Sequence, residues 1–236
     1  MDSLRGALAA LVTGIALALV IVALAILPFL TPPWVAFAQG RAQAEAWTGF
    51  TTDQLATVTS GILADLVVGP PDFDVTVAGS PVLTEAERGH MRDVRGVFAG
   101  FFLAAVVAFG VLVAMWAAAR GVVARRRFWR RFGGSGLVIA GVVVVGGVAG
   151  VVLFDQAFTL FHQLFFPGGN WQFDPRTDRL VQLFPQSFWV ESTIAVGVVV
   201  LALALLAAWV GRRRARALES RAALAASLGT RPVGAR

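Results

Sequence analysis

The chain alternates long, uncharged apolar stretches with polar segments. No charged residue lies between Arg5 and Arg41, and an apolar run extends from about residue 7 to residue 30. Three further uncharged stretches follow, of 24, 23 and 20 residues, at 96–119, 132–154 and 192–211. Because about 20 apolar residues cross a bilayer as a helix, the pattern predicts four transmembrane helices.

The same pattern divides the chain into eight predicted segments. The four membrane helices are expected at 1–30, 94–119, 135–154 and 191–211. Between and after them we expect an extracytoplasmic loop at 31–93, a basic cytoplasmic loop at 120–134, a second extracytoplasmic loop with a helical extension at 155–190, and a cytoplasmic tail at 212–236. The predicted fold class is therefore an all-α membrane protein, in which the two outer loops form an extracytoplasmic subdomain.

The first apolar stretch has a competing interpretation as a cleaved signal peptide. Ala36-Phe37-Ala38 has the small-residue pattern of a cleavage site. However, the preceding apolar run exceeds 20 residues, whereas the apolar region of a signal peptide is typically 7–15 residues long. A retained transmembrane helix is the favoured interpretation.

The distribution of arginine predicts the orientation. Placing the segments around 120–131 and 212–216 in the cytoplasm gives 14 arginines and 2 acidic residues inside, and 6 arginines and 12 acidic residues outside. These numbers account for all 20 basic and 14 acidic residues of the chain. Positive charge is enriched in cytoplasmic segments, so both termini are expected in the cytoplasm.

Composition excludes several classes of chemistry. Only 14% of the residues are charged, against about a quarter in an ordinary soluble domain. The chain has no cysteine, and all of its basic residues are arginine, so disulfides, thiolate chemistry and a lysine Schiff base are excluded. The arginine clusters flank predicted membrane helices, which favours contact with anionic lipid head groups and argues against nucleic acid.

The first outer loop contains recognisable helix and strand signals. Thr52 or Asp53 is expected to cap a helix whose apolar residues recur at helical spacing: Leu55, Val58, Ile62 and Leu66. This amphipathic helix is expected on the membrane surface or over the mouth of the bundle. Alternation over residues 73–77 predicts a short strand. Thr84 and Glu87 form a predicted capping box at the start of a helix that carries His90 into the second membrane span.

The second outer loop begins with an aromatic-rich segment, 154–166, that is expected to continue the third membrane helix outward. Asp155, Thr159 and His162 would share one helical face, because seven residues bring a helix back to within about 20°. Pro167-Gly168-Gly169 is expected to end this helix. In the third span, Gly146 and Gly150 have the spacing that permits close helix packing.

His90 and His162 are the only histidines, and both fall in the predicted outer segments. Each could be an interfacial side chain packed among aromatic residues, but both lie beside carboxylates on the same predicted side of the membrane. Ionisable groups near membrane depth favour a functional role. The histidines lack the spacing of known metal motifs and the carboxylates are scattered, so no metal or other cofactor is expected. Gly134-Ser135-Gly136 lacks the strand–turn–helix context of a nucleophile elbow.

The motifs of both outer loops resemble those of the bacterial lipoprotein intramolecular transacylase family. The resemblance is carried by Leu83-Thr84-Glu85 through His90-Met91-x-Asp93-Val94, Phe154-Asp155 through Phe161-His162-x-x-Phe165-Phe166, Gly169-Asn170-Trp171-x-Phe173-Asp174-Pro175, Asp178-x-Leu180 and Leu183-Phe184-Pro185-x-x-Phe188-Trp189. It extends to the whole predicted topology of four spans and two outer loops. Arg95 follows Asp93-Val94 as a basic residue, as the family pattern leads one to expect.

The resemblance implies a multi-pass enzyme of the bacterial cytoplasmic membrane with its active site on the outer face. Such an enzyme moves the sn-2 acyl chain of a diacylglyceryl lipoprotein to the α-amine of the lipidated N-terminal cysteine, which yields a lyso-form lipoprotein. The expected partners are the diacylated lipoprotein and membrane lipid. The resemblance maps the two catalytic histidines onto His90 and His162.

Histidine suits this reaction, because an α-amine of pKa about 7.7–8.0 must lose a proton before it attacks an ester. His162 is the expected base and His90 the expected acid or second relay. The candidate supporting or oxyanion-stabilising residues are Asn170, Trp171, Arg92, Asp93, Asp155, Asp174 and Asp178. Two alternatives remain open at this point: a non-enzymatic lipid- or lipoprotein-binding membrane protein, and a metal-dependent lipid hydrolase.

Overall fold

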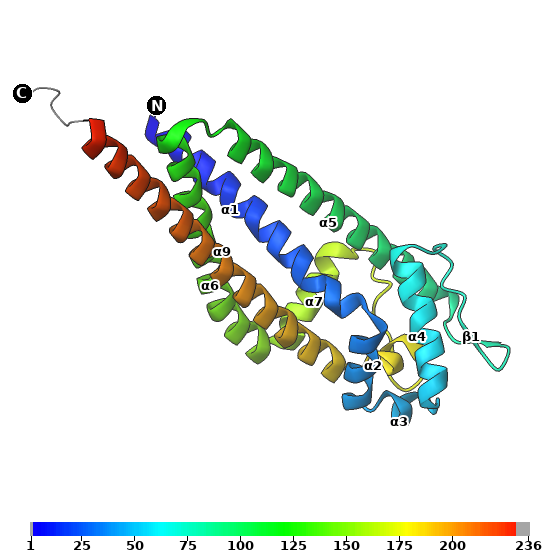
Figure 1. The fold of residues 1–236 in the computed structure, drawn as a ribbon. Helices are drawn as coiled ribbons and strands as arrows, with labels where there is room; N and C mark the ends of the chain where they lie inside the picture. Colours follow the sequence, from blue (N-terminus) through cyan, green and yellow to red (C-terminus); the bar gives the residue numbers. More distant parts are fainter. Residues whose placement is uncertain (1, 230–236) are drawn as a thin grey trace, which may run out of the picture. The chain divides into compact units, whose positions relative to one another are not determined.

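The computed structural model describes residues 2–229 and is dominated by helices. Its elements are α1 Asp2–Ile26, the 3₁₀ helix η1 Leu27–Leu30, α2 Pro32–Arg41, α3 Ala44–Thr48, α4 Thr52–Val67, β1 Thr76–Val77, β2 Ser80–Pro81, α5 Glu85–Ala118, α6 Gly121–Val152, α7 Phe154–Phe165, α8 Arg179–Leu183 and α9 Gln186–Gly229 (Figure 1). Residue 1 of the predicted segment 1–30 lies outside the described residues. Residues 230–236 of the predicted segment 212–236 also lie outside them.

Four helical stretches in the described part of the chain are long and apolar enough to cross a membrane. They are Leu4–Leu30, Glu85–Ala118, Gly121–Gly150 and Gln186–Leu224. The prediction of an all-α membrane protein with four candidate transmembrane helices is therefore confirmed. The two short strands form the one small sheet found within residues 2–229.

The chain divides into two compact units, each made of segments that are distant in the sequence. The first unit contains the stretch up to Val22, Ala104–Val144 and the chain from Val200 onward. The second unit contains Ala23–Leu103 and Val145–Val199. The long helices contribute residues to both units.

In the first unit, parts of α1, α5, α6 and α9 lie side by side (Figure 1). Helices α6 and α9 approach so closely that a Cβ atom added at Gly136 would lie 2.6 Å from the carbonyl oxygen of Ala204. A Cβ atom at Gly211 would lie 2.5 Å from the Gly133 backbone. Small residues permit this backbone approach in the absence of a strong hydrophobic driving force between membrane helices.

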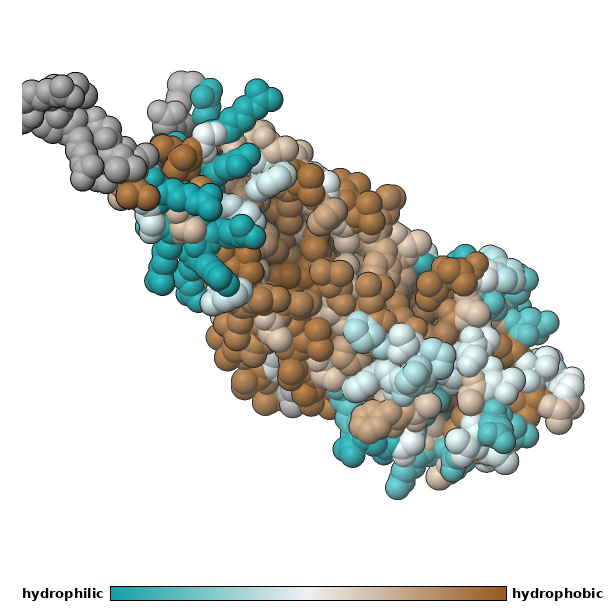
Figure 2. Space-filling model, viewed as in Figure 1, coloured by the Kyte–Doolittle hydropathy of each residue, from teal (hydrophilic) through white to brown (hydrophobic). Residues whose placement is uncertain are grey.

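The predicted close packing at Gly146 and Gly150 is wrong. A Cβ atom added at either glycine would meet nothing within 4 Å. The glycines of α6 that face a partner helix are Gly133 and Gly136, near the arginine-rich end of the helix. Figure 2 shows hydrophilic side chains gathered over this arginine-rich end of the first unit, next to a hydrophobic surface.

The second unit has a core around the apolar face of α4. Leu55, Val58 and Ile62 are buried there, together with residues from the hairpin, the start of α5 and α8: Phe73, Val75, Val82, Leu83, Met91, Leu180 and Leu183. This face of α4 is therefore covered by protein and is not available to a membrane surface, which was one of the two predicted placements. Both outer segments supply residues to this core.

Helix α4 begins one residue earlier than predicted. Thr51 is the N-cap, with an extended backbone, and it forms a reciprocal capping box with Gln54. The predicted caps, Thr52 and Asp53, are already helical. The Thr51 side chain accepts a hydrogen bond from the Gln54 amide, and the Gln54 side chain accepts one from the Thr51 amide. Both otherwise unpaired donors of the first turn are thereby satisfied.

The predicted strand at 73–77 is shorter in the structure. Only Thr76 and Val77 pair with Ser80 and Pro81, in an antiparallel hairpin whose turn is formed by Ala78 and Gly79 at positive φ. Phe73 also has a positive φ of 51° and is fully buried. Its amide donates to the Asp65 carboxylate over 2.9 Å, which fixes this unusual conformation against α4.

Two further helix starts can be compared with the prediction. The Thr84–Glu87 capping box is confirmed: the Thr84 amide donates to the Glu87 carboxylate, and the Glu87 amide donates to the Thr84 hydroxyl. Helix α6 begins at Gly121, so the predicted loop at 120–134 is almost entirely helical. Arginine is a good helix former, and the segment contains no proline, which explains the early start.

Helix α7 is separate from α6, contrary to the predicted outward continuation. The backbone breaks at Leu153, with φ −111° and ψ 36°, and α7 leaves the axis of α6 (Figure 1). Helix α9 extends to Gly229, so the described part of the predicted tail is helical as well.

Candidate active site

His90 lies in the second turn of α5 and is buried, with 6% of its surface exposed. Its ring centroid lies 4.8 Å from that of Phe166 and 5.7 Å from that of Phe173, both in edge-on geometry. Its Nδ1 atom is buried and has no hydrogen-bond partner among the described residues. A buried polar atom left without a partner is costly, and such atoms are concentrated at functional sites.

His162 lies on α7 and has a defined tautomer. Its Nδ1 atom lies 2.8 Å from the carbonyl oxygen of Phe158, one turn earlier in the same helix. A carbonyl oxygen can only accept, so Nδ1 carries the hydrogen and, in the neutral ring, Nε2 keeps a free lone pair. The Phe158 and Trp171 rings lie 4.0 and 4.9 Å from the imidazole.

The two histidines face each other. Their ring centroids are 6.0 Å apart and their planes are inclined by 27°. Phe166 contacts both, at 4.8 Å from His90 and 5.5 Å from His162. Both histidines and this phenylalanine belong to the second unit. The fold therefore joins the two residues that the sequence singled out into one aromatic-walled site.

A hydrogen bond near the histidine pair joins helix α5 to the segment that follows α7. The Asn170 side-chain amide donates to the Asp93 carboxylate over 2.6 Å. Asp93 follows His90 by three residues and so lies on the same face of α5. The next residue after Asn170 is Trp171, whose ring contacts His162. This short segment after α7 therefore connects the Asp93 carboxylate with the surroundings of His162.

Burial lowers the pKa of His162 below its ordinary value of 6.5, and the hydrogen bond to the Phe158 carbonyl opposes this shift less strongly. At neutral pH the ring is therefore largely uncharged. A neutral imidazole with a free Nε2 lone pair can accept a proton, which is the requirement for a general base.

Glu87 is a supporting residue that sequence reasoning recognised only as part of a helix cap. Its carboxylate is fully buried, and one oxygen accepts from the Thr84 amide and hydroxyl. The other oxygen accepts from the Leu180 amide over 2.6 Å. Glu87 precedes His90 by one turn, so this carboxylate fixes the start of α5, and with it His90, against α8.

Several predicted candidates lie outside the site. Arg92 pairs with Glu85 on the exposed side of α5. Asp155 accepts a hydrogen bond from Gln186 at the start of α9. Asp174 is held by Arg176, whose hydrogen bonds lower the pKa of that carboxyl to about 2. Asp178 accepts from the Asp174 amide over 2.7 Å. These four residues stabilise loops and helix ends.

Phe166 and Phe173 are part of the site although they were not predicted as site residues. Both occur in the motifs that carry the family resemblance, and their sequence signal was only their position near His162 and Asn170. Within residues 2–229 no group of three or more histidine, aspartate or glutamate side chains could hold a metal ion. The chemistry available from the residues present is proton transfer between imidazoles beside an aromatic, apolar wall.

The match to a family model and the match to solved structures name the same kind of protein. The model of the Lit family, lipoprotein intramolecular transacylase, matches residues 11–189. The in meso structure of the membrane integral lipoprotein intramolecular transacylase Lit from Bacillus cereus is similar with a TM-score of 0.72 and 17% identity, covering 92% of this chain and 99% of that one. A variant of that protein in which a histidine is replaced by arginine is similar with a TM-score of 0.65 and 17% identity. This match covers 93% of this chain and 96% of that one. At this identity the likeness establishes the fold.

An uncharacterised protein of Aquifex aeolicus (strain VF5) is also similar. It is 29% identical over 137 residues, which are 56% of this chain and 58% of that relative. The match thus covers less than two thirds of the relative's length.

Proposed function

Because the chain belongs to the lipoprotein intramolecular transacylase family, we propose that it is a membrane acyltransferase that moves an acyl chain within a lipoprotein. The proposed substrate carries a diacylglyceryl group on its N-terminal cysteine. The sn-2 acyl chain moves from its glycerol ester to the α-amine of that cysteine, and the product is a lyso-form lipoprotein.

The observation that carries this proposal is the facing pair of histidines, 6.0 Å apart, with the Nε2 lone pair of His162 free. His162 removes a proton from the α-amine, whose nitrogen then attacks the ester carbonyl carbon. The carbon–oxygen bond to glycerol breaks, and the departing oxygen receives a proton from the imidazolium of His162 or by way of His90. An amide and a free hydroxyl result, and the charge and atoms balance without a covalent enzyme intermediate.

The apolar wall supports this mechanism. Phe158, Phe166, Phe173 and Trp171 place apolar surface against the two rings, and a bound substrate would complete the exclusion of water that limits hydrolysis of the ester. Both reacting groups belong to one substrate molecule. The main task of the protein is therefore to hold the amine and the ester in reactive geometry.

The tetrahedral intermediate needs a donor to its oxyanion, and two groups are suitably placed. Trp171 lies against His162, and its indole N–H makes no hydrogen bond within the described residues. Asn170 retains one N–H while the other donates to Asp93. Arg92, the third predicted donor, pairs with Glu85 outside the site and takes no part in this proposal.

The proposed location is the bacterial cytoplasmic membrane, with both termini in the cytoplasm and the histidine pair at the outer face. The arginine asymmetry supports this orientation: residues 104–144 and 200–229 contain eleven arginines and one acidic residue. Lipidated proteins are displayed on the outer face, which is where the proposed reaction requires the histidines.

The deciding experiment expresses the full chain in a bacterial host that makes diacylated lipoproteins. The N-terminal lipopeptide is then fragmented by tandem mass spectrometry, since internal transfer leaves the intact mass unchanged. We expect an acylated amine and a lyso-glycerol with the wild-type chain, and loss of transfer with His162→Ala or His90→Ala.

Asp155→Asn and Arg92→Gln serve as matched controls that should retain transfer. A free amine in the presence of the wild-type chain would contradict the transacylase. Transfer that depends on the chain but tolerates both histidine variants would contradict the histidine mechanism. Release of free fatty acid that a chelator abolishes would indicate a metal-dependent hydrolase.

A further inference from the structure

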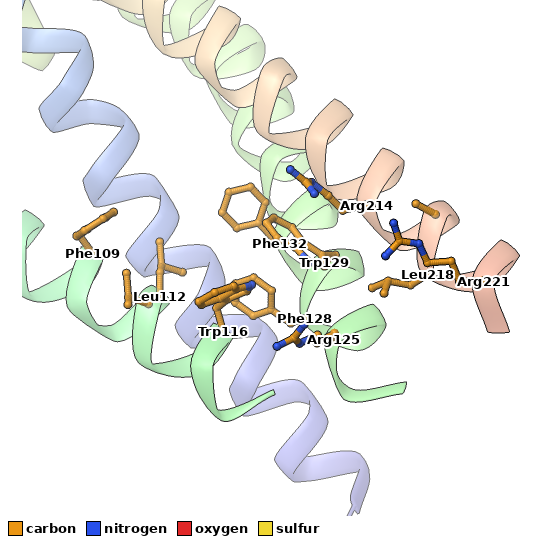
Figure 3. Close-up of a pocket in the computed structure, with 12 residues that line it drawn as sticks. Phe109, Leu112, Trp116, Arg125, Phe128, Trp129, Phe132, Arg214, Leu218 and Arg221 are labelled. Carbon is orange, nitrogen blue, oxygen red and sulfur yellow. The ribbon is translucent and has the colours of Figure 1, made fainter. Parts of the chain in front are cut away.

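The first unit contains a cavity of about 550 Å³ that shares no residue with the histidine site. Three helices line it, and each contributes four residues at positions i, i+3, i+4 and i+7, which form one helical face. Figure 3 shows these side chains projecting from α5, α6 and α9. The volume is within the range of small-molecule and cofactor sites.

The walls from α5 and α6 are apolar and largely aromatic. Phe109 and Trp116 come from the last turns of α5, and Phe128, Trp129 and Phe132 come from the first turns of α6. Phe128 is buried, whereas Phe109 and Trp116 are largely exposed. Large apolar rings left exposed at the end of a membrane helix are suited to contact with the acyl chains and glycerol region of a lipid.

Positive charge lines the rest of the cavity. Arg214 and Arg221 lie on one face of α9, and Arg125 of α6 lies with its guanidinium 5.9 Å from the Trp116 ring. Neither Arg214 nor Arg221 has an ion-pair partner among the described residues. Glu219, the one acidic residue in the segments 104–144 and 200–229, pairs with Arg126. Thus the cavity arginines keep their charge unneutralised.

A cavity with an aromatic lining and an unneutralised arginine edge is complementary to an anionic amphiphile. It lies where α5 ends at Ala118 and α6 begins at Gly121, at the junction between apolar helix and arginine-rich helix. In a membrane this junction corresponds to the head-group level, where basic pockets between helices hold anionic lipid head groups.

We propose that this cavity is a binding site for an anionic phospholipid of the cytoplasmic leaflet. One acyl chain lies against Trp116, Phe128 and Phe132, and the phosphate is held by Arg125, Arg214 and Arg221. The bound lipid links the end of the α5–α6 connection to α9 and stabilises the folded protein by mass action. The site is separate from the proposed substrate site and does not depend on transacylase activity.

The test measures lipid binding to the full chain in detergent by native mass spectrometry. The probes are phosphatidylglycerol, phosphatidylcholine of the same acyl chains, and inorganic phosphate. We expect phosphatidylglycerol to bind at least tenfold more tightly than phosphatidylcholine and to survive competition by millimolar phosphate. Equal binding of both lipids, or displacement by inorganic phosphate, would overturn the proposal.

Two variants and a control localise the binding. The triple variant R125Q/R214Q/R221Q should weaken phosphatidylglycerol binding at least tenfold. Ala217→Trp keeps every arginine, but its ring would fill the cavity from an exposed position on α9, so it should weaken binding similarly. The control R120Q/R127Q/R130Q removes the same charge from exposed arginines outside the cavity and should change binding less than about twofold.

Equal weakening by the control and the cavity triple would indicate diffuse attraction and contradict the site, as would unchanged binding by Ala217→Trp. Unfolding temperatures in lipid-free detergent establish that each variant is folded. His162→Ala should bind phosphatidylglycerol like the wild type, so a failure of the transacylase proposal leaves this result unaffected.

Discussion

The buried carboxylate of Glu87 accepts a hydrogen bond from the backbone amide of Leu180, over 2.6 Å and 93 positions of sequence. This contact joins the capping box of α5 to the short helix α8. It therefore brings the element that carries His90 against the segment that follows Asn170 and Trp171.

Glu87→Gln should destabilise the protein by about 2–3 kcal/mol, because an amide replaces one of two acceptor oxygens that face backbone donors. Thermal unfolding in detergent measures the effect. Glu85→Gln is the matched control, since Glu85 forms only exposed ion pairs and the substitution should destabilise the protein much less than Glu87→Gln. Equal effects of the two variants would show that the Leu180 contact is not important.

The His162 ring should titrate with the lowered pKa that its burial implies. The neutral ring persists below pH 6.5, so it should gain its proton with a midpoint below 6.5. The linked stability has the same direction: the folded state binds its proton less readily than the unfolded chain, so stability is present above pH 6.5 and declines as the pH falls below it. The NMR chemical shifts of the His162 ring, followed across pH 4–8 in micelles without substrate, provide the test, and a midpoint above 6.5 would contradict it.

Asn170→Asp should reduce transfer at least tenfold, because it would place a second carboxylate against Asp93 at hydrogen-bonding distance. The double variant N170D/D93N restores a donor–acceptor pair with the roles exchanged and should recover much of the lost rate. Acylated lipopeptide counted by mass spectrometry gives the rates. If the double variant is as impaired as the single one, the pair has a role beyond its mutual contact.

Trp171→Phe keeps an aromatic ring beside His162 and removes only the indole N–H. If this N–H stabilises the oxyanion, the rate should fall about 10²-fold or more, with little change in KM. Trp189→Phe is the control, because its N–H donates to the Phe184 carbonyl outside the histidine site. An unimpaired Trp171→Phe would assign the oxyanion contact to Asn170.

Gly136→Ala should destabilise the first unit by about 1–3 kcal/mol, because the added methyl group would lie 2.6 Å from the Ala204 carbonyl oxygen. Gly146→Ala, in the same helix, meets nothing within 4 Å and should be neutral or slightly stabilising, because alanine favours helix more than glycine does. The unfolding temperatures of the two variants are compared in the same detergent. The reverse order would contradict the observed packing.

The four membrane helices were predictable because the requirement for an apolar run of sufficient length is local in sequence. The start of α6 and the end of α9 were not, because exposed arginines continue a helix beyond the membrane as readily as they end a span. The break at Leu153 has no proline, and the nearest glycine, Gly150, lies inside α6, so the position of the break could not be derived from the sequence.

The rarity of His90 and His162 and the motifs around them were enough to select both residues of the candidate site. The contacts of the residues around them could be predicted only in part. Asp93 shares the helical face of His90. Arg92 lies about 200° around the helix from His90, on the side where it pairs with Glu85. The Glu87 contact with Leu180 depends on how two distant segments fold together. Sequence spacing identifies which residues share a helical face, but it does not identify their partners across the fold.

The hydrogen bond between His162 and Phe158 fixes the tautomer of the proposed base. Its acceptor is a backbone carbonyl four residues earlier, so a single turn of α7 determines which ring nitrogen is protonated. The lone pair of Nε2 thus depends on local secondary structure and on no side chain that would contact the proposed substrate. Substitutions at such contacts can therefore change substrate binding while the same ring nitrogen of His162 remains the acceptor.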